Sequence, residues 1–256
     1  MKLVDLTQPW GANTPPFLTE PSPKISVVSR SGVSAKALFS QKIETSMHCG
    51  THIDAPIHAV PGGKDMASVP LEQLYGDGVI VDISDVCGEF DIIQPHHITD
   101  KMEVKRGDIL IIHTGFHHYY FNGPTPDKTA YFCRHPGPYK EFADWAIEMK
   151  LKWIGFDCGS ADHPMNGVIR ELRPDIARQF EKKIGKKADE VFPKESWSLI
   201  HRRLFSYDII HAENVGGDID DVLNTRAKIG AFPWKFEGGD ASICRIVAFV
   251  EEQEGR

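Results

Sequence analysis

The sequence predicts an α/β fold, because apolar runs of strand length alternate with stretches of helical periodicity along the chain. Such an alternation is typical of a sheet that is partly covered by helices. The expected strands cover residues 79–83, 108–113, 152–156, 208–211 and 243–250. The expected helices cover residues 139–151, 169–184 and 196–204.

The helix over 139–151 shows the clearest periodicity. Its apolar residues recur at the i, i+3, i+4, i+7 spacing of one helix face, at Phe142, Trp145, Ala146 and Met149. In the helix over 169–184, Pro174 lies near the N-terminal turn, where proline is tolerated. These patterns place helices between the expected strands.

We expect residues 1–256 to form a single domain, long enough to bury a sizeable core. The least regular part is an insertion around 116–138, which mixes aromatic residues and histidines with a turn-rich stretch at 122–127. Irregular segments of this length inside compact domains are usually functional. This one is expected to cover substrate or to contact another copy of the chain.

Composition excludes several classes of function. A net charge of −7 gives no support for nucleic-acid binding. The N-terminus lacks the apolar stretch of a signal peptide, and no segment approaches the ~18 apolar residues of a membrane span. Five cysteines without a C-x-x-C pair indicate reduced thiols. We therefore expect a cytoplasmic protein with a small-molecule substrate, no nucleic acid and no membrane partner.

The most informative motif is HCGTHIDAPIH at residues 48–58, which holds three histidines and one carboxylate. Imidazole nitrogens and carboxylate oxygens are typical ligands of catalytic zinc, manganese and iron. His48, His52, Asp54 and His58 all occupy even positions, so in a strand they would share one face. The motif therefore predicts a metal site.

An ideal strand would keep these ligands too far apart. At about 3.3 Å per residue, His48 and His52 would be roughly 13 Å apart, whereas bonds to a shared ion are near 2 Å. Gly50 permits the bulge or turn that brings them together. Pro56 then ends the strand and leaves His58 on a loop nearby. We expect a kinked strand that presents His48, His52 and Asp54 to one ion.

The same residues resemble the H-x-G-T-H-x-D-x-P-x-H signature of the metal-dependent cyclase-like hydrolases, a family that includes bacterial kynurenine formamidases and isatin hydrolases. Every fixed position of that signature is filled. The resemblance extends through residues 4–9, 111–115 and 155–157 and ends near His201 and Glu213. It implies a swivelling β/β/α architecture and assembly into a homodimer or homotetramer.

The resemblance also implies how a second ion would be held. Asp54 would bridge the two ions, with His201 and Glu213 completing the second site. His211, on the same strand face as Glu213, is an alternative to His201 in that pairing. The cofactor is then Mn²⁺ or Zn²⁺, with one or two ions per chain. Asp157 and Asp162 are candidates for orienting the liganding histidines.

The hypothesis for function is hydrolysis of an amide C–N bond by metal-activated water, with His58 as general base and then as general acid. Isatin-type ring opening is the first reaction considered. The alternatives are an arylformamidase acting on N-formylkynurenine, or a lactone hydrolase or cyclase on the same centre. A metal-binding small-molecule sensor is the alternative that is not an enzyme.

A flat aromatic substrate would need aromatic walls. The candidate substrate-binding residues are Trp10, Phe17, Phe39, His163 and Trp234. The remaining histidines have no distinctive spacing, and most are expected at the surface: His96, His97, His117, His118 and His135.

Overall fold

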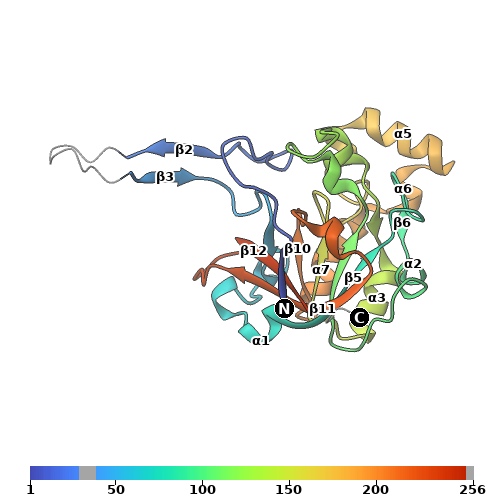
Figure 1. The fold of residues 1–256 in the computed structure, drawn as a ribbon. Coiled ribbons are helices and arrows are strands. Elements are labelled where there is room, and N and C mark those ends of the chain that lie inside the picture. Colours follow the sequence, from blue (N-terminus) through green and yellow to red (C-terminus); the bar gives the residue numbers. More distant parts are fainter. Residues whose placement is uncertain (29–38, 252–256) are drawn as a thin grey trace.

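The computed structural model describes residues 1–28 and 39–251, and its largest feature is one eight-stranded sheet (Figure 1). The strands are β1 (Lys2–Asp5), β2 (Lys24–Val27), β3 (Gln41–Glu44), β4 (His52–Asp54), β5 (Tyr75–Asp82), β6 (Ile92–Ile93), β7 (Ile109–His113), β8 (Gly137–Pro138), β9 (Trp153–Phe156), β10 (Ile210–Glu213), β11 (Thr225–Pro233) and β12 (Ala241–Val250).

The α-helices are α1 (Leu71–Leu74), α2 (Pro95–Thr99), α3 (Lys140–Glu148), α4 (Ile169–Leu172), α5 (Pro174–Ile184), α6 (Ala188–Val191) and α7 (Leu199–Phe205). Shorter 3₁₀ turns are η1 (Pro56–His58), η2 (Met66–Ser68), η3 (Phe116–Tyr119), η5 (Lys194–Ser196) and η6 (Ile219–Val222), and η4 (Ala130–Arg134) is π-helical.

The large sheet closes on itself. Its order is β1-β12-β11-β5-β7-β9-β10-β4, and β4 also pairs with β12. Seven strands therefore form a closed barrel, with β1 added to the outside of β12. The α/β prediction is confirmed, and each expected strand corresponds to part of this barrel. The parallel run β5-β7-β9-β10 supplies one side of the barrel.

Alternation along the strands explains how the barrel has two apolar faces. Ile109 and Ile111 of β7 belong to a core cluster that draws residues from strands all around the ring, which places that cluster inside the barrel. Leu110 and Ile112 belong to a second cluster, with apolar residues of α3 and α7. Because both faces are covered, the parallel strands are continuous apolar runs in the sequence.

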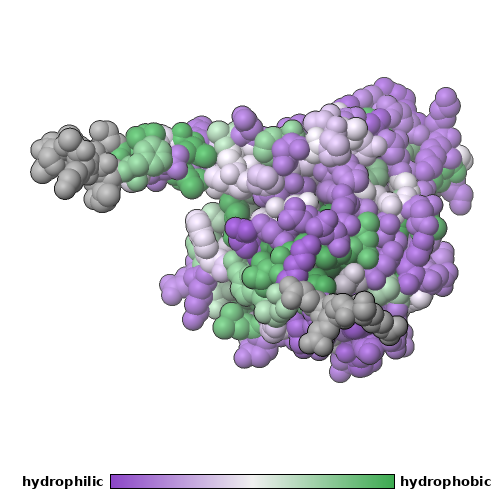
Figure 2. Space-filling view, in the orientation of Figure 1, coloured by the Kyte–Doolittle hydropathy of each residue, from purple (hydrophilic) through white to green (hydrophobic). Residues whose placement is uncertain are grey.

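An arm leaves this compact body. Strands β2 and β3 pair as an antiparallel hairpin that extends away from the barrel (Figure 1). Its apolar side chains are largely exposed, including Val27, Val28 and Ile43, and they are visible as green patches on the arm in Figure 2.

Two expectations about local structure need correction. The helix expected over 169–184 is two helices, α4 and α5, because Pro174 starts a new helix after Arg173 leaves helical geometry. The segment 116–138 is more regular than expected, since it contains η3 and η4 and buries Tyr120, Tyr131 and Phe132.

Among the described residues, no helix is both long enough and apolar enough to cross a bilayer.

Candidate metal centre

The bend that the motif requires lies at Gly50, between His48 and β4. Gly50 has a φ of +75°, and a Cβ atom there would lie 2.6 Å from the Trp10 ring. Only glycine therefore satisfies both the backbone and the close packing. The expected kink is confirmed, but His48 lies in a turn before the strand rather than within it.

Strand β4 is held between β10 and β12, so its three residues are fully buried. His52 pairs in register with Glu213 of β10, and Asp54 pairs with Ala241 of β12. This register places side chains from three distant parts of the sequence beside one another.

The first half of the centre surrounds one oxygen of Asp54. His52 Nδ1 donates to the Gly50 carbonyl at 2.8 Å, so Nε2 carries the lone pair. That Nε2 lies 3.3 Å from Asp54 Oδ1 and 3.6 Å from Glu213 Oε2. His48 Nδ1 lies 3.0 Å from the same Asp54 oxygen.

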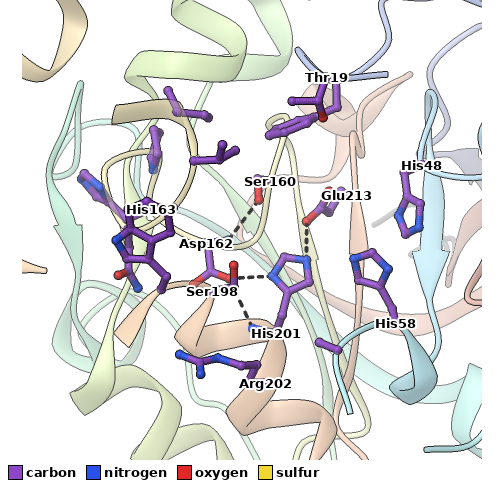
Figure 3. A pocket seen from close by; sticks show the side chains of 18 of the residues that line it. Thr19, His48, His58, Ser160, Asp162, His163, Ser198, His201, Arg202 and Glu213 are labelled. Carbon is purple, nitrogen blue, oxygen red and sulfur yellow. Dashed lines mark hydrogen bonds and ion pairs between the residues drawn. The ribbon is translucent and has the colours of Figure 1, made fainter. Parts of the chain in front are cut away.

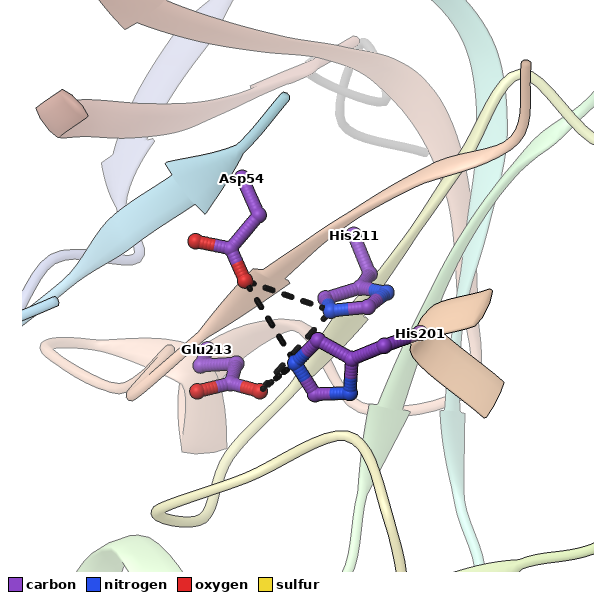
Figure 4. A group of neighbouring side chains, drawn as sticks. All are labelled: Asp54, His201, His211 and Glu213. Carbon is purple, nitrogen blue, oxygen red and sulfur yellow. Dashed lines mark ion pairs between the residues drawn. The ribbon is translucent and has the colours of Figure 1, made fainter. Parts of the chain in front are cut away.

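The second half surrounds the other oxygen of Asp54, as Figure 4 shows. His211 Nε2 lies 3.3 Å and His201 Nε2 3.7 Å from Asp54 Oδ2. The same two nitrogens lie 3.8 Å and 3.5 Å from Glu213 Oε1. The carboxylate of Asp54 thus lies between two groups of imidazoles.

Asp162 contacts His201 in the orienting arrangement expected from the sequence. Its Oδ2 accepts from His201 Nδ1 at 2.6 Å, which directs Nε2 toward Asp54 and Glu213. Its carboxylate also accepts the backbone N–H groups of Ile200 and His201 at the start of α7. Asp157, by contrast, accepts hydrogen bonds from Thr114, Gly115 and His117, away from this centre.

Burial and charge set the ionisation of the cluster. Burial opposes ionisation of Asp54, yet His48 and His52 hold its pKa well below the usual value. Burial raises the pKa of Glu213, and Asp54 raises it further. Burial also lowers the pKa of His211 to about 4, with a contribution from His201. His211 is therefore a neutral imidazole, the form that binds metals.

The residues present fit a divalent cation. His52 Nε2, both Asp54 oxygens and both ring nitrogens of His211 are buried without a hydrogen-bond partner. Unsatisfied buried polar atoms are costly. A cation between these lone pairs would satisfy them, and a set of imidazoles and carboxylates suits zinc or manganese.

The cluster opens into a cavity of about 530 Å³. His48 and His58 lie on one side of it and His201 and Glu213 on the other (Figure 3). His58 is partly exposed, and its Nδ1 lies 3.4 Å from Asp240 Oδ2. Asp240 also contacts His48 Nε2 at 2.9 Å. The cavity thus places His58 beside the candidate ligands.

Residues 4–163 match the model of a protein family described as a putative cyclase. The chain belongs to this family. Among curated relatives, it is 27% identical over 210 residues to a kynurenine formamidase of Erythrobacter litoralis (strain HTCC2594), covering 80% of this chain and 74% of that protein. A kynurenine formamidase of Bacillus anthracis is 25% identical over 260 residues, 96% of each chain.

Solved structures share the fold of this cyclase-family chain. Isatin hydrolase A from Labrenzia aggregata, bound to benzyl benzoate, superimposes with a TM-score of 0.74 at 20% identity, covering 98% of this chain and 94% of that one. A potential metal-dependent hydrolase with cyclase activity gives a TM-score of 0.66 at 21% identity, covering 98% and 99%. The expected architecture of the cyclase-like hydrolases is confirmed by these likenesses.

The structure brings together all the candidate ligands and His58, but only some of the candidate substrate-binding residues. Phe17 and His163 line the cavity. His163 Nε2 donates to the Phe90 carbonyl, and His163 Nδ1 accepts from the Met165 N–H, so the ring stabilises the local backbone.

Three candidates do not line the cavity within one chain. Trp10 packs against Gly50 and donates to the Cys49 carbonyl at 3.0 Å, behind the ligand turn. Phe39 is 73% exposed and Trp234 62% exposed. Aromatic character alone does not predict which residues line the cavity, because strand pairing in the barrel and the course of the β2–β3 arm place these three side chains away from it.

The sequence analysis missed three contributions to the site. His201 and His211 are not alternatives, since both reach Asp54; the spacing of His211 and Glu213 on one strand face was the available signal. Asp240 carried no sequence signal, because only the pairing of β12 with β4 brings it to His48. Trp197 also lines the cavity.

Proposed function

We propose that this protein is a metal-dependent amidohydrolase that cleaves the C–N bond of a small aromatic amide, with isatin-type ring opening as the first candidate reaction. One observation carries the proposal: imidazoles from three parts of the chain converge on the buried carboxylate of Asp54 at a cavity of about 530 Å³. That volume is within the usual range for a small-molecule site. The names of the curated relatives and of the similar structures support the same class of reaction.

Two groups of residues would hold divalent ions. His48, His52 and Asp54 would hold one, and Asp54, His201, His211 and Glu213 a second, with zinc or manganese as the cofactor. When bound, such an ion supplies hydroxide at neutral pH and withdraws charge from a carbonyl oxygen.

His58 is the residue placed to move the proton. Burial lowers its pKa below the usual value, so the imidazole is neutral and accepts a proton near pH 7. Asp240, 3.4 Å from Nδ1, orients the ring and stabilises the imidazolium that forms. His58 would then return the proton to the departing nitrogen.

The cavity walls suit a flat ring. Phe17 and Trp197 line it, and Phe17 is supported edge-on by Phe132 at 6.0 Å between ring centroids. The indole of Trp197 is in turn held against the Arg170 guanidinium, 4.8 Å from the ring centroid. Rigid aromatic surfaces would position an aryl amide with its carbonyl toward Asp54 and His58.

The decisive experiment compares turnover of isatin, N-formylkynurenine and an aryl lactone by protein loaded with Mn²⁺ or Zn²⁺. The proposal predicts the highest kcat/KM for isatin. A preference for N-formylkynurenine would instead establish the arylformamidase alternative, which the likeness to kynurenine formamidases favours. Preference for the lactone would move the assignment to ester chemistry. No turnover of any of the three, with ions bound, would overturn the enzyme proposal in favour of a sensor.

The exposed arm supports a proposal about assembly. Apolar side chains on β2 and β3 are left in solvent within one chain, and a second copy of the chain would cover them in a homodimer or homotetramer. Light scattering of the protein and of an Ile43→Glu variant tests this: the variant should dissociate. A wild-type monomer would contradict it.

A further inference from the structure

A second cluster of histidines and carboxylates lies at the carboxyl ends of β5, β7 and β9. Asp82 and His113 are the last residues of β5 and β7 and pair in register, and Asp157 follows the end of β9. His117 and His118 come from η3, and Asp220 comes from η6. The cluster shares no residue with the candidate metal centre.

The three imidazoles direct their Nε2 atoms at one carboxylate. His113 Nε2 lies 3.3 Å from Asp220 Oδ1. His117 Nε2 lies 3.3 Å and His118 Nε2 2.9 Å from Asp220 Oδ2. His117, His118 and Asp220 therefore offer three possible ligand atoms within 4.8 Å of one another, and His113 Nε2 faces the other oxygen of Asp220.

Other carboxylates hold two of these imidazoles from behind. His113 Nδ1 donates to Asp82 Oδ1 at 2.8 Å, and His117 Nδ1 donates to Asp157 Oδ2 at 3.1 Å. Asp157 is itself fixed, because it accepts from the backbone N–H groups of Thr114 and Gly115, both at 2.9 Å. A carboxylate behind an imidazole is the usual support of a metal-binding histidine.

These contacts determine where the lone pairs point. With a proton on Nδ1, a neutral imidazole carries its lone pair on Nε2. In His113 that lone pair faces an oxygen of Asp220, which is also an acceptor, whereas His117 Nε2 is hydrogen-bonded to Asp220 Oδ2 at 3.3 Å. His113 Nε2 is buried and has no hydrogen-bond partner, and the His113 side chain is only 4% exposed. A cation in the shared volume would satisfy all of these acceptors at once.

The spacing fits a tetrahedral ion. With bonds of 2.0–2.1 Å, neighbouring ligand atoms of a tetrahedron are about 3.3–3.4 Å apart. To Asp220 Oδ2, the His117 contact is 3.3 Å and the His118 contact 2.9 Å, and His113 Nε2 lies 3.3 Å from Asp220 Oδ1. Three imidazole nitrogens and one carboxylate oxygen form a ligand set that suits zinc.

We propose that His113, His117, His118 and Asp220 form an additional zinc site, separate from the candidate metal centre. Asp220 and His118 are 52% and 39% exposed, which gives the ion a path from solvent. The bound ion would fasten η3 and η6 to the end of β7. Its role is structural, since it connects segments more than 100 residues apart in the sequence.

The site is tested by counting zinc on metal-stripped protein in a background that lacks the other centre. An Asp54→Asn/His201→Gln variant removes ligands only from the candidate metal centre. Titrated with zinc alone, it should retain about one equivalent, and addition of Asp220→Asn should remove that equivalent. Cobalt bound in place of zinc should show the visible bands of a tetrahedral ion, and these should also disappear with Asp220→Asn.

Asp221→Asn is the matched control, because Asp221 is the next residue of η6 and its carboxylate pairs with exposed Lys2 outside the cluster. It should keep the equivalent of zinc. His118→Gln, at a partly exposed position, repeats the test without disturbing a buried ring. Zinc should raise the Tm of the background variant, and Asp220→Asn should abolish that increase.

Equal zinc binding with and without Asp220→Asn, in proteins with the same far-UV circular dichroism, would overturn the proposal. The cluster would then be a network of histidines hydrogen-bonded to Asp82, Asp157 and Asp220. Neither result depends on which substrate the enzyme cleaves, so the proposed function stands or fails separately.

Discussion

Two histidine clusters lie in different parts of the barrel, one around β4 and β10 and the other at the carboxyl ends of β5, β7 and β9, and they differ in how many ligand atoms lack a hydrogen-bond partner. Around Asp54, four imidazoles lie among Asp54, Glu213 and two further carboxylates, Asp162 and Asp240, and several ligand atoms have no hydrogen-bond partner. Around Asp220, three imidazoles are matched by three carboxylates, and only His113 Nε2 lacks a partner. The first arrangement leaves more buried polar atoms that a cation would satisfy, whereas the second is largely satisfied without one.

The surroundings differ as well. The Asp54 cluster opens into the 530 Å³ cavity, with His58 and aromatic walls beside it. The Asp220 cluster faces solvent through two partly exposed side chains. The comparison teaches that, of the two clusters, the one around Asp54 combines its possible ligands with a cavity and with a histidine placed for proton transfer.

The largest expected effect separates the two clusters directly. Asp54→Asn removes the carboxylate that both halves of the catalytic cluster share, and kcat/KM should fall by at least about 10³-fold. Asp220→Asn is the matched variant in the other cluster and should leave kcat/KM within about twofold. Steady-state kinetics on both variants measure these two effects. An equal loss of kcat/KM in both would show that the clusters act as one unit.

The next effect concerns proton transfer. His58→Gln should lower kcat by on the order of 10²-fold, at the lower end of the range for general acid–base catalysis because water reaches this partly exposed side chain. Metal content, measured by elemental analysis, should be unchanged. Loss of metal together with activity would make His58 a ligand rather than the proton-transfer group.

A smaller effect compares the carboxylates that hold imidazoles from behind. Asp162→Asn weakens the support of His201 and should lower metal affinity at the catalytic cluster by about 10-fold. Asp82→Asn should weaken zinc binding at the Asp220 cluster to a similar degree without changing kcat. Competition with a chromophoric chelator measures both affinities. A change in kcat with Asp82→Asn would contradict the separation of the two clusters.

The smallest effect concerns His163, where burial rather than a bound cation makes the free energy of unfolding depend on pH. Burial depresses the pKa of His163 to about 3, whereas the unfolded chain titrates near 6.5. Between these two pKa values, the unfolded state therefore binds a proton that the folded state does not bind. The contribution of His163 to stability is complete above about pH 6.5 and is lost as pH falls, by up to about 1.4 kcal/mol per pH unit.

His163→Gln should accordingly flatten the decrease in unfolding free energy between pH 6.5 and pH 4, as measured by urea denaturation. His96→Gln, at an exposed position, is the control and should reproduce the wild-type slope. If the two variants showed the same slope, His163 would not be the group responsible.

Much of the catalytic cluster was predictable because its signal is local. His48, His52, Asp54 and His58 lie within eleven residues, and the need for a bend at Gly50 followed from strand geometry alone. The strands were predictable for a related reason, since strands buried on both faces are continuous apolar runs.

The Asp220 cluster was not predicted, and the expectation that most of the remaining histidines lie at the surface is wrong for His117 and His135, which are buried. A signal was nevertheless present, because Asp82, His113 and Asp157 each stand at the end of an expected strand. Only the adjacency of β5, β7 and β9 turns those three ends into one location.

The sequence by itself determined the α/β class, the bent ligand motif and the residue types for metal chemistry, because each of these depends on neighbours within about ten residues. The tertiary structure decided that His201 and His211 both face Asp54, that Asp240 adjoins His48, and that Trp10, Phe39 and Trp234 do not line the cavity. The physical reason is that closure of the barrel through β4 and β12 sets these distances, and strand order is a property of the whole chain rather than of any segment.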